Sequence, residues 1–158
     1  MNKNYLPLLA LLILVFTDSS GQCRASFVYT GSGNACGQGR FDAVDYLGNG
    51  AIISERASSG NTWAANSSSY VSFKDIGAIP PGIYRINLKD ASKNIFSLAV
   101  VSVPDMYSRD GFLIHGYNTG QTREEASKGC IILDANQRQR LRTVIDVCKE
   151  VELVVAIN

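Results

Sequence analysis

The stretch Gly111-Phe112-Leu113-Ile114-His115-Gly116 contains the only histidine of this 158-residue chain. A second stretch, Ser127-Lys128-Gly129-Cys130-Ile131, follows it a short distance along the sequence. Both segments are short, carry apolar residues and have glycine beside them, which is typical of strand ends. A cysteine is a strong nucleophile only as the thiolate, and a neighbouring imidazole is a common acceptor of its proton. We therefore expect His115 and Cys130 to form one site that transfers an acyl group through the cysteine.

Each of these residues also has a purely structural interpretation. A lone histidine on a strand is often a packed core residue, and His115 fits that description as well. Cys130 is alternatively a buried cysteine or one half of a disulfide. Gly129 is alternatively only a turn residue.

The remaining pattern predicts a mostly β domain, a β-rich α+β fold. Apolar and polar residues alternate with a period of two over 84–88 and again over 96–100, which indicates two strands joined by a hairpin. Asp134 followed by Gln137 predicts a helix N-terminus with a capping box. We expect one substantial helix after Asp134, with Leu141, Val144 and Ile145 on its buried face. Further strands are expected at 51–54, 111–115, 130–133 and 151–157, whereas 26–49 is rich in glycine and small polar residues and 58–69 is interpreted as a long loop.

The N-terminus has the pattern of a signal peptide for the general export path. Lys3 precedes an apolar run that is shorter than the roughly 20 residues of a membrane span, and Ser19 and Gly21 are small enough for cleavage after Gly21. We expect residues 1–21 to be the leader and residues 22–158 to be one domain, periplasmic or secreted. No stable membrane insertion is expected once the leader is removed. The alternative is that the leader stays uncleaved as an anchor.

Charge and cysteine usage restrict the choice of partners. The chain has 15 Lys and Arg against 14 Asp and Glu, so it lacks the basic stripe that binding to nucleic acid requires. One histidine and four scattered cysteines give no ligand spacing for zinc, and we expect neither a metal nor a cofactor. Export permits disulfides, and a bridge between Cys23 and Cys36 would close a loop of about 14 residues, worth on the order of 3 kcal/mol. Cys148 lies on the apolar helix face and is interpreted as buried and inert.

Three segments, in order, resemble the L,D-transpeptidase catalytic domain, the YkuD-like family. Ile79-Pro80-Pro81-Gly82-Ile83-Tyr84 is similar to the turn and strand of that family. Phe112-Leu113-Ile114-His115-Gly116 is similar to its histidine strand, and Ser127-Lys128-Gly129-Cys130-Ile131 to its cysteine loop. Ala57-Ser58-Ser59-Gly60-Asn61 looks like the divergent branch that includes type VI secretion L,D-transpeptidase effectors. The resemblance implies an L,D-transpeptidase-like β-sandwich with one helix.

Two residues depart from the family pattern, and the order of the candidate histidine and cysteine argues against a rival family. Lys128 stands where the family has a histidine, and Ile132 stands where it often has Arg or Asn. Both changes concern the grip on the substrate and leave the nucleophile and the base in place. NlpC/P60 hydrolases place the cysteine before the histidine, whereas His115 precedes Cys130.

The resemblance implies acyl transfer on the tetrapeptide stems of peptidoglycan, through a Cys130 thioester with His115 as base. Gly129 and Cys130 would offer backbone amides to the oxyanion, and Ser127 would orient His115. The candidate substrate-binding residues are Arg123, Lys128, Tyr117 and Asn118. The acceptor would be water, a D-amino acid or a second stem, and the first two are favoured because residues typical of cross-linking enzymes are absent. The alternatives are a non-catalytic envelope-binding module with the same fold and an antibacterial cell-wall toxin.

Overall fold

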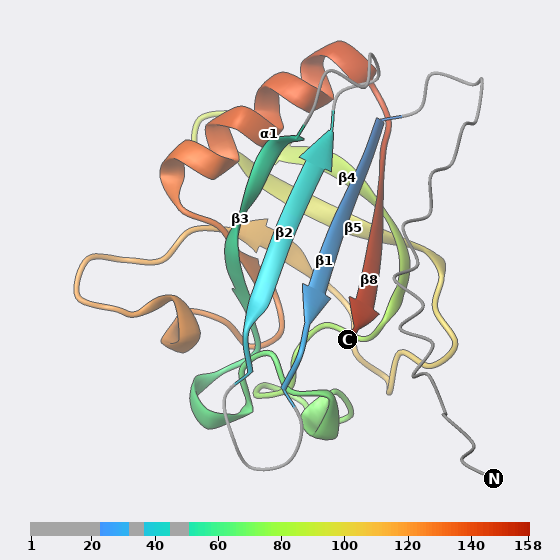
Figure 1. The fold of residues 1–158 in the computed structure, drawn as a ribbon, viewed down its shortest axis with the longest axis vertical. Coiled ribbons are helices and arrows are strands. Elements are labelled where there is room, and N and C mark those ends of the chain that lie inside the picture. The colour runs from blue at the N-terminus through green and yellow to red at the C-terminus, as the bar shows by residue number, and fades with distance from the viewer. Residues whose placement is uncertain (1–22, 32–36, 45–50) are drawn as a thin grey trace, which may run out of the picture.

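The computed structural model describes residues 23–31, 37–44 and 51–158, and in this part the chain forms one sheet of eight strands and one α-helix (Figure 1). The mostly β fold with a single substantial helix is thereby confirmed. The predicted leader, residues 1–21, and Cys36 lie outside the described residues. The strands are β1 (Cys23–Tyr29), β2 (Gly39–Val44), β3 (Ala51–Ser59), β4 (Gly82–Asp90), β5 (Ile95–Ser102), β6 (Leu113–His115), β7 (Ile131–Ile132) and β8 (Val151–Ile157), and the helix is α1 (Ala135–Cys148).

The expected two-layered sandwich takes the form of a single sheet that closes on itself. The strand order is β1-β2-β3-β7-β6-β5-β4-β8, and β8 returns to pair with β1. Only two of the neighbouring pairs are parallel, namely β1 with β8 and β6 with β7. The second of these pairs matters for the site, because it aligns the histidine strand with the strand that follows the cysteine.

The alternating patterns place one face of each long strand inside the closed sheet. In β4 the side chains of Tyr84 and Ile86 are buried while Arg85 and Asn87 are exposed, as the period-two pattern predicts. The same alternation holds in β1 and β2, although the sequence around them was interpreted as loop-like. Several of their inward positions carry small residues, such as Ala25 and Gly39, so the alternation of apolar and polar side chains is weak there.

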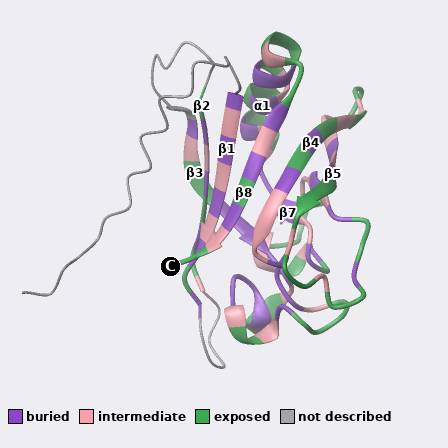
Figure 2. Cartoon of the chain, turned by 90° about the vertical axis from the view of Figure 1, so that its right-hand side faces the viewer, coloured by how far each residue is buried: buried purple, intermediate pink, exposed green. Residues whose placement is uncertain are grey.

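Helix α1 begins where the capping box predicted. The Asp134 side chain accepts a hydrogen bond from the Gln137 amide, and the Gln137 side chain accepts one from the Asp134 amide. Leu141, Val144 and Ile145 are buried and join the core cluster that fills the sheet. Figure 2 shows this buried side of the helix turned toward the strands. Among the described residues, no helix is long and apolar enough to cross a membrane.

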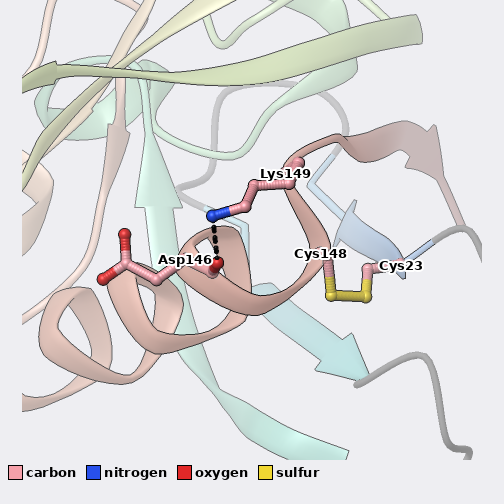
Figure 3. Close-up of a disulfide and its surroundings, with 4 residues drawn as sticks. All are labelled: Cys23, Asp146, Cys148 and Lys149. Atoms are coloured by element: carbon pink, nitrogen blue, oxygen red, sulfur yellow. Dashed lines mark hydrogen bonds between the residues drawn. A yellow bond between two sulfur atoms is a disulfide. The ribbon is translucent and has the colours of Figure 1, made fainter.

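The disulfide differs from the expected one. Cys23 pairs with Cys148, with 5.8 Å between the two Cα atoms, so the predicted Cys23–Cys36 bridge is wrong and Cys148 is not an inert buried thiol. Figure 3 shows the bond joining the last residue of α1 to the first residue of β1. The parallel register that places Cys23 opposite Val151 brings these two positions together. This pairing depends on a contact between the two ends of the domain, which local sequence does not reveal.

The segment between β3 and β4 is irregular, as expected, and two buried tyrosines fix its end. It contains two short 3-10 helices, Thr62–Ala64 and Ser68–Tyr70. The Tyr29 hydroxyl donates to the Ile79 carbonyl at 3.0 Å, and the Tyr84 hydroxyl donates to the Pro80 carbonyl at 2.7 Å. The turn that begins with Ile79 and Pro80 is therefore held from the inside of the sheet.

Candidate active site

The loop that carries Cys130 is organised by the hydroxyl of Ser127. Ser127 Oγ donates to the Cys130 carbonyl at 2.6 Å and accepts from the Gly129 amide at 2.9 Å. The hydroxyl thus closes a tight turn around residues 127–130. The hydroxyl of Ser127 therefore contacts the cysteine loop, and the predicted role of Ser127 in orienting His115 stays a prediction.

The space and the backbone conformation at position 129 admit only glycine. Its φ of +127° is one that L side chains rarely adopt, and a Cβ there would overlap the Arg109 guanidinium and the Phe112 ring. Its amide already donates to Ser127, so the Cys130 amide is the remaining candidate donor to an oxyanion. The glycine in this motif therefore makes room for an arginine that the sequence did not single out.

Cys130 itself is half-buried and is a free thiol. The Leu113 amide donates a hydrogen bond to its sulfur, with 3.3 Å between N and Sγ. Burial raises the pKa of the Cys130 thiol, while the Leu113 amide and then the charges of Arg109 and Lys89 lower it. Since burial is the largest effect, the thiol at rest is neutral near pH 7, and its proton must be removed when it attacks.

His115 is the last residue of β6 and is half-buried. Its Nδ1 lies 2.6 Å from the Gly116 carbonyl oxygen. Because a carbonyl oxygen can only accept, this contact requires the proton on Nδ1 and leaves the lone pair on Nε2. The ring is therefore held in the tautomer that a general base needs.

The strand register places His115 at the end of β6 and Cys130 directly before the neighbouring strand β7. Ile114 of β6 is opposite Ile131 of β7, and both of these side chains are completely buried in the core. Side chains alternate along a strand, so His115 projects from the face of β6 opposite to that of Ile114. Diagonal neighbours on one face of a sheet are roughly 7–8 Å apart, within reach of long and aromatic side chains.

Cys130 borders a cleft of about 200 Å³. Its lining also includes Lys74, Asp75, Ser108, Arg109, Asp110, Gly111, Phe112 and Lys128. Of the four predicted substrate-binding residues, only Lys128 lines this cleft, and its ammonium lies 3.8 Å from a carboxylate oxygen of Asp75. The cleft thus combines an apolar wall at Phe112 with several charged groups near the thiol.

The other three predicted substrate-binding residues lie elsewhere. Tyr117 is exposed and lines a second hollow, together with Gly116 and the first turn of α1. Arg123 lies near the carboxylate of the helix cap Asp134, with 4.0 Å between nitrogen and oxygen. Asn118 is in an exposed turn closed by Gln121. Within the described part of the chain, no group of three His, Cys, Asp or Glu side chains is placed to hold a metal ion.

Two buried polar residues at the site were missed by sequence reasoning. The Ser59 hydroxyl donates to the Gly129 carbonyl at 2.7 Å and accepts from the Ile79 amide at 2.8 Å, and so links two of the quoted motifs. Arg109 is 6% exposed and binds backbone carbonyls on both sides of the cleft. The only available signal for Ser59 was its place in the Ala57-Ser58-Ser59-Gly60-Asn61 motif, and Arg109 had none.

In the described residues, a closed, mostly β sheet holds the free Cys130 directly before β7 and His115 at the end of the neighbouring strand β6. The comparison with protein families identifies the family to which this domain belongs. The model of the Tlde1 domain matches residues 54–156, more than half of the chain, and the protein belongs to the Tlde1 domain family. This is a family of type VI secretion L,D-transpeptidase effectors, the branch whose resemblance the sequence suggested.

The comparisons with individual proteins are less informative about this chain than the family match. The chain has no match among curated protein sequences. Among solved structures it is similar to the helical cell shape determining protein Pgp2 from Campylobacter jejuni, at 14% identity and a TM-score of 0.44, over 84% of this chain and 48% of that one. A mutant of the same Pgp2 gives 15% identity, a TM-score of 0.46, and coverage of 85% and 47%. The chain therefore spans about half the length of these structures.

Proposed function

We propose that this protein is a cysteine acyltransferase or hydrolase that acts on the tetrapeptide stems of peptidoglycan, with Cys130 as nucleophile and His115 as base. The observation that supports the proposal is the pairing of β6 with β7, because His115 is the last residue of β6 and the free Cys130 directly precedes β7. Membership of the Tlde1 domain family supports the choice of peptidoglycan.

The chemistry follows from the two side chains. His115 Nε2 accepts the thiol proton as the sulfur attacks the carbonyl carbon of the L-configured centre of meso-diaminopimelate. The carbon–sulfur bond forms, the peptide carbon–nitrogen bond breaks, and the protonated imidazole returns the proton to the departing amine of D-alanine. The thioester is then attacked by water or by the amine of a D-amino acid, and the thiol is released.

Backbone groups assist this reaction. The Cys130 amide is the candidate donor to the oxyanion, an effect worth about 3 kcal/mol for one donor. The Leu113 amide stabilises negative charge on the sulfur before and after the attack. Lys128, at the edge of the same cleft, is the candidate to hold a carboxylate of the stem.

The test is digestion of purified tetrapeptide muropeptides with the protein. We expect loss of terminal D-alanine in water and its replacement when another D-amino acid is added, both followed by mass spectrometry. Cys130→Ala must abolish both reactions, and His115→Ala must reduce both strongly. As a control, Arg142→Gln, on the outer side of α1, leaves both reactions unchanged. Unchanged D-alanine with the intact protein, or equal release by Cys130→Ala, would contradict the proposal.

The family favours a second use of the same chemistry, an antibacterial toxin that acts on the cell wall. With a leader at residues 1–21, the protein would reach the periplasm or the medium through general export. Expression with and without a periplasmic signal separates the cases. Swelling or lysis confined to periplasmic expression, and absent with Cys130→Ala, supports a toxin, whereas normal growth in both compartments contradicts it.

A further inference from the structure

A buried arginine lies between the cysteine loop and the segment that faces it. Arg109 is 6% exposed, and each terminal nitrogen of its guanidinium donates to two backbone carbonyls. Nη1 bonds Val71 and Ala78, the latter at 2.8 Å, and Nη2 bonds Gly77 at 2.7 Å and Lys128 at 3.3 Å. One rigid planar group therefore ties the 71–78 segment to the residue two positions before Cys130.

The charge of Arg109 is not neutralised by a carboxylate at short range. In residues 23–31, 37–44 and 51–158, each ion pair within 4.0 Å involves another basic residue. The guanidinium instead lies over the Phe112 ring, 4.9 Å from its centre. A buried charge without a paired charge is costly, and its cost falls when a negative charge forms nearby.

The group close to Arg109 that acquires a negative charge during the proposed reaction is the Cys130 thiol. Arg109 and Cys130 border the same cleft. The guanidinium also packs directly against Gly129, the residue before Cys130, and leaves no room there for a side chain. The charge of Arg109 favours the thiolate, and the thiolate in turn favours the charged guanidinium, whose pKa is lowered chiefly by burial.

We propose that Arg109 is a positioning residue for Cys130: it holds the Lys128–Cys130 turn against residues 71–78 and directs a fixed positive charge at the attacking sulfur. This inference rests on the proposed function of the same site. It explains why a long cationic side chain is buried there, since four neutral carbonyls satisfy the N–H groups of its two terminal nitrogens and leave its charge available.

The other charged groups around the thiol are less suited to this role. They are Lys74, Asp75, Asp110 and Lys128 on the cleft, Lys89 at longer range and His115 on β6. The Lys128 side chain is 74% exposed and pairs with Asp75, whose side chain is 60% exposed, so solvent screens both. Arg109 is buried, is held in place by its bonds to backbone carbonyls, and borders the same cleft as the Cys130 thiol.

The test measures the rate of Cys130 alkylation by iodoacetamide against pH, by intact mass, in the folded protein with its Cys23–Cys148 bond. Arg109→Gln keeps N–H donors but removes the charge, and Arg109→Lys keeps the charge but loses the planar fork. We expect Arg109→Gln to slow alkylation about tenfold at pH 7.5 and to move the profile up by about one pH unit. Arg142→Gln, on the outer side of α1 where Arg142 pairs with Asp146, is the control and leaves the profile unchanged.

For Arg109→Lys we expect a profile close to that of the unmodified protein but faster hydrogen exchange at residues 128–130, because one ammonium nitrogen with three N–H groups cannot keep all four carbonyl contacts of the two guanidinium nitrogens. A folded Arg109→Gln variant with an unshifted profile overturns the proposal. If Arg109→Gln does not fold, Arg109→Lys decides, and unchanged exchange at these residues overturns it. Alkylation requires no muropeptide, so failure here is distinguishable from failure of the proposed function.

Discussion

The Leu113 amide and the Cys130 sulfur are joined by a hydrogen bond of 3.3 Å, across the gap between β6 and the loop before β7. Leu113 and His115 are two positions apart on β6 and so project from the same face of the strand. One three-residue strand therefore supplies a donor to the thiolate and the candidate base. The parallel pairing of β6 with β7 fixes the backbone of both residues relative to the segment that carries Cys130.

The Cys130 thiol should be neutral at rest. Burial raises its pKa above the ordinary value, so at any given pH a smaller fraction is thiolate than for a free cysteine. We expect iodoacetamide to alkylate folded Cys130 more slowly than free cysteine at pH 7.5, with a rate that still increases above pH 9. Unfolding in urea should remove the difference. An alkylation rate that is already maximal at pH 7 would instead indicate a preformed thiolate–imidazolium pair.

The parts of the fold that were predicted depend on local patterns, and the parts that were missed depend on distant contacts. The alternation around Tyr84 and Ile86 and the capping box at Asp134 are each contained in a few residues, so β4 and the start of α1 were found. The Cys23–Cys148 bond requires β1 to pair with β8 across the whole domain.

The same distinction applies to the site. The motifs that carry His115 and Cys130 are short and could be read from the sequence, and their catalytic roles stay predictions. Ser59 and Arg109 bind mainly backbone groups, and a backbone carbonyl carries no sequence signal. Three of the four residues predicted to bind substrate lie outside the Cys130 cleft, because proximity in sequence to the motifs did not determine their direction.

Removal of the Ser59 hydroxyl should weaken both the fold and the site. Ser59→Ala leaves the Gly129 carbonyl and the Ile79 amide buried without their partner, at a cost of about 2–3 kcal/mol in the free energy of unfolding. Urea unfolding measures this cost, and muropeptide digestion measures the loss of activity. Ser58→Ala is the matched control, since Ser58 is equally buried but its hydroxyl has only a 3.4 Å contact with Asn66. Equal losses for the two variants would show that the link to Gly129 is unimportant.

The Cys23–Cys148 bond should contribute strongly to stability. The two cysteines are 125 residues apart, and in the chain-entropy model a loop of this size is worth about 4–5 kcal/mol. We expect the Cys23→Ala and Cys148→Ala double variant to unfold at a much lower urea concentration than the oxidised protein. Dithiothreitol should lower the midpoint of the parent protein to a similar degree and leave that of the double variant unchanged. Cys130→Ala, which keeps the bond, should unfold near the parent midpoint when oxidised.

The two buried tyrosines should make the protein sensitive to alkali. Burial is the main cause that raises the pKa of both Tyr29 and Tyr84 far above the ordinary value of about 10, and each hydroxyl donates to a carbonyl of the Ile79–Pro80 turn. Their neutral forms are therefore favoured by the folded state. The contribution of these tyrosines to stability is complete below about pH 10 and is lost as the pH rises above it, because the tyrosines of the unfolded chain ionise first.

Between pH 10 and 11.5 we expect each of the two buried tyrosines to reduce the free energy of unfolding by about 1.4 kcal/mol per pH unit. Tyr29→Phe or Tyr84→Phe should lower stability at pH 8 by about 1 kcal/mol yet reduce the alkaline slope by the share of one tyrosine, whereas Tyr117→Phe, at an exposed position, should change neither. Urea unfolding at a series of pH values measures the slopes, and equal slopes for all three variants would show that Tyr29 and Tyr84 ionise in the folded protein.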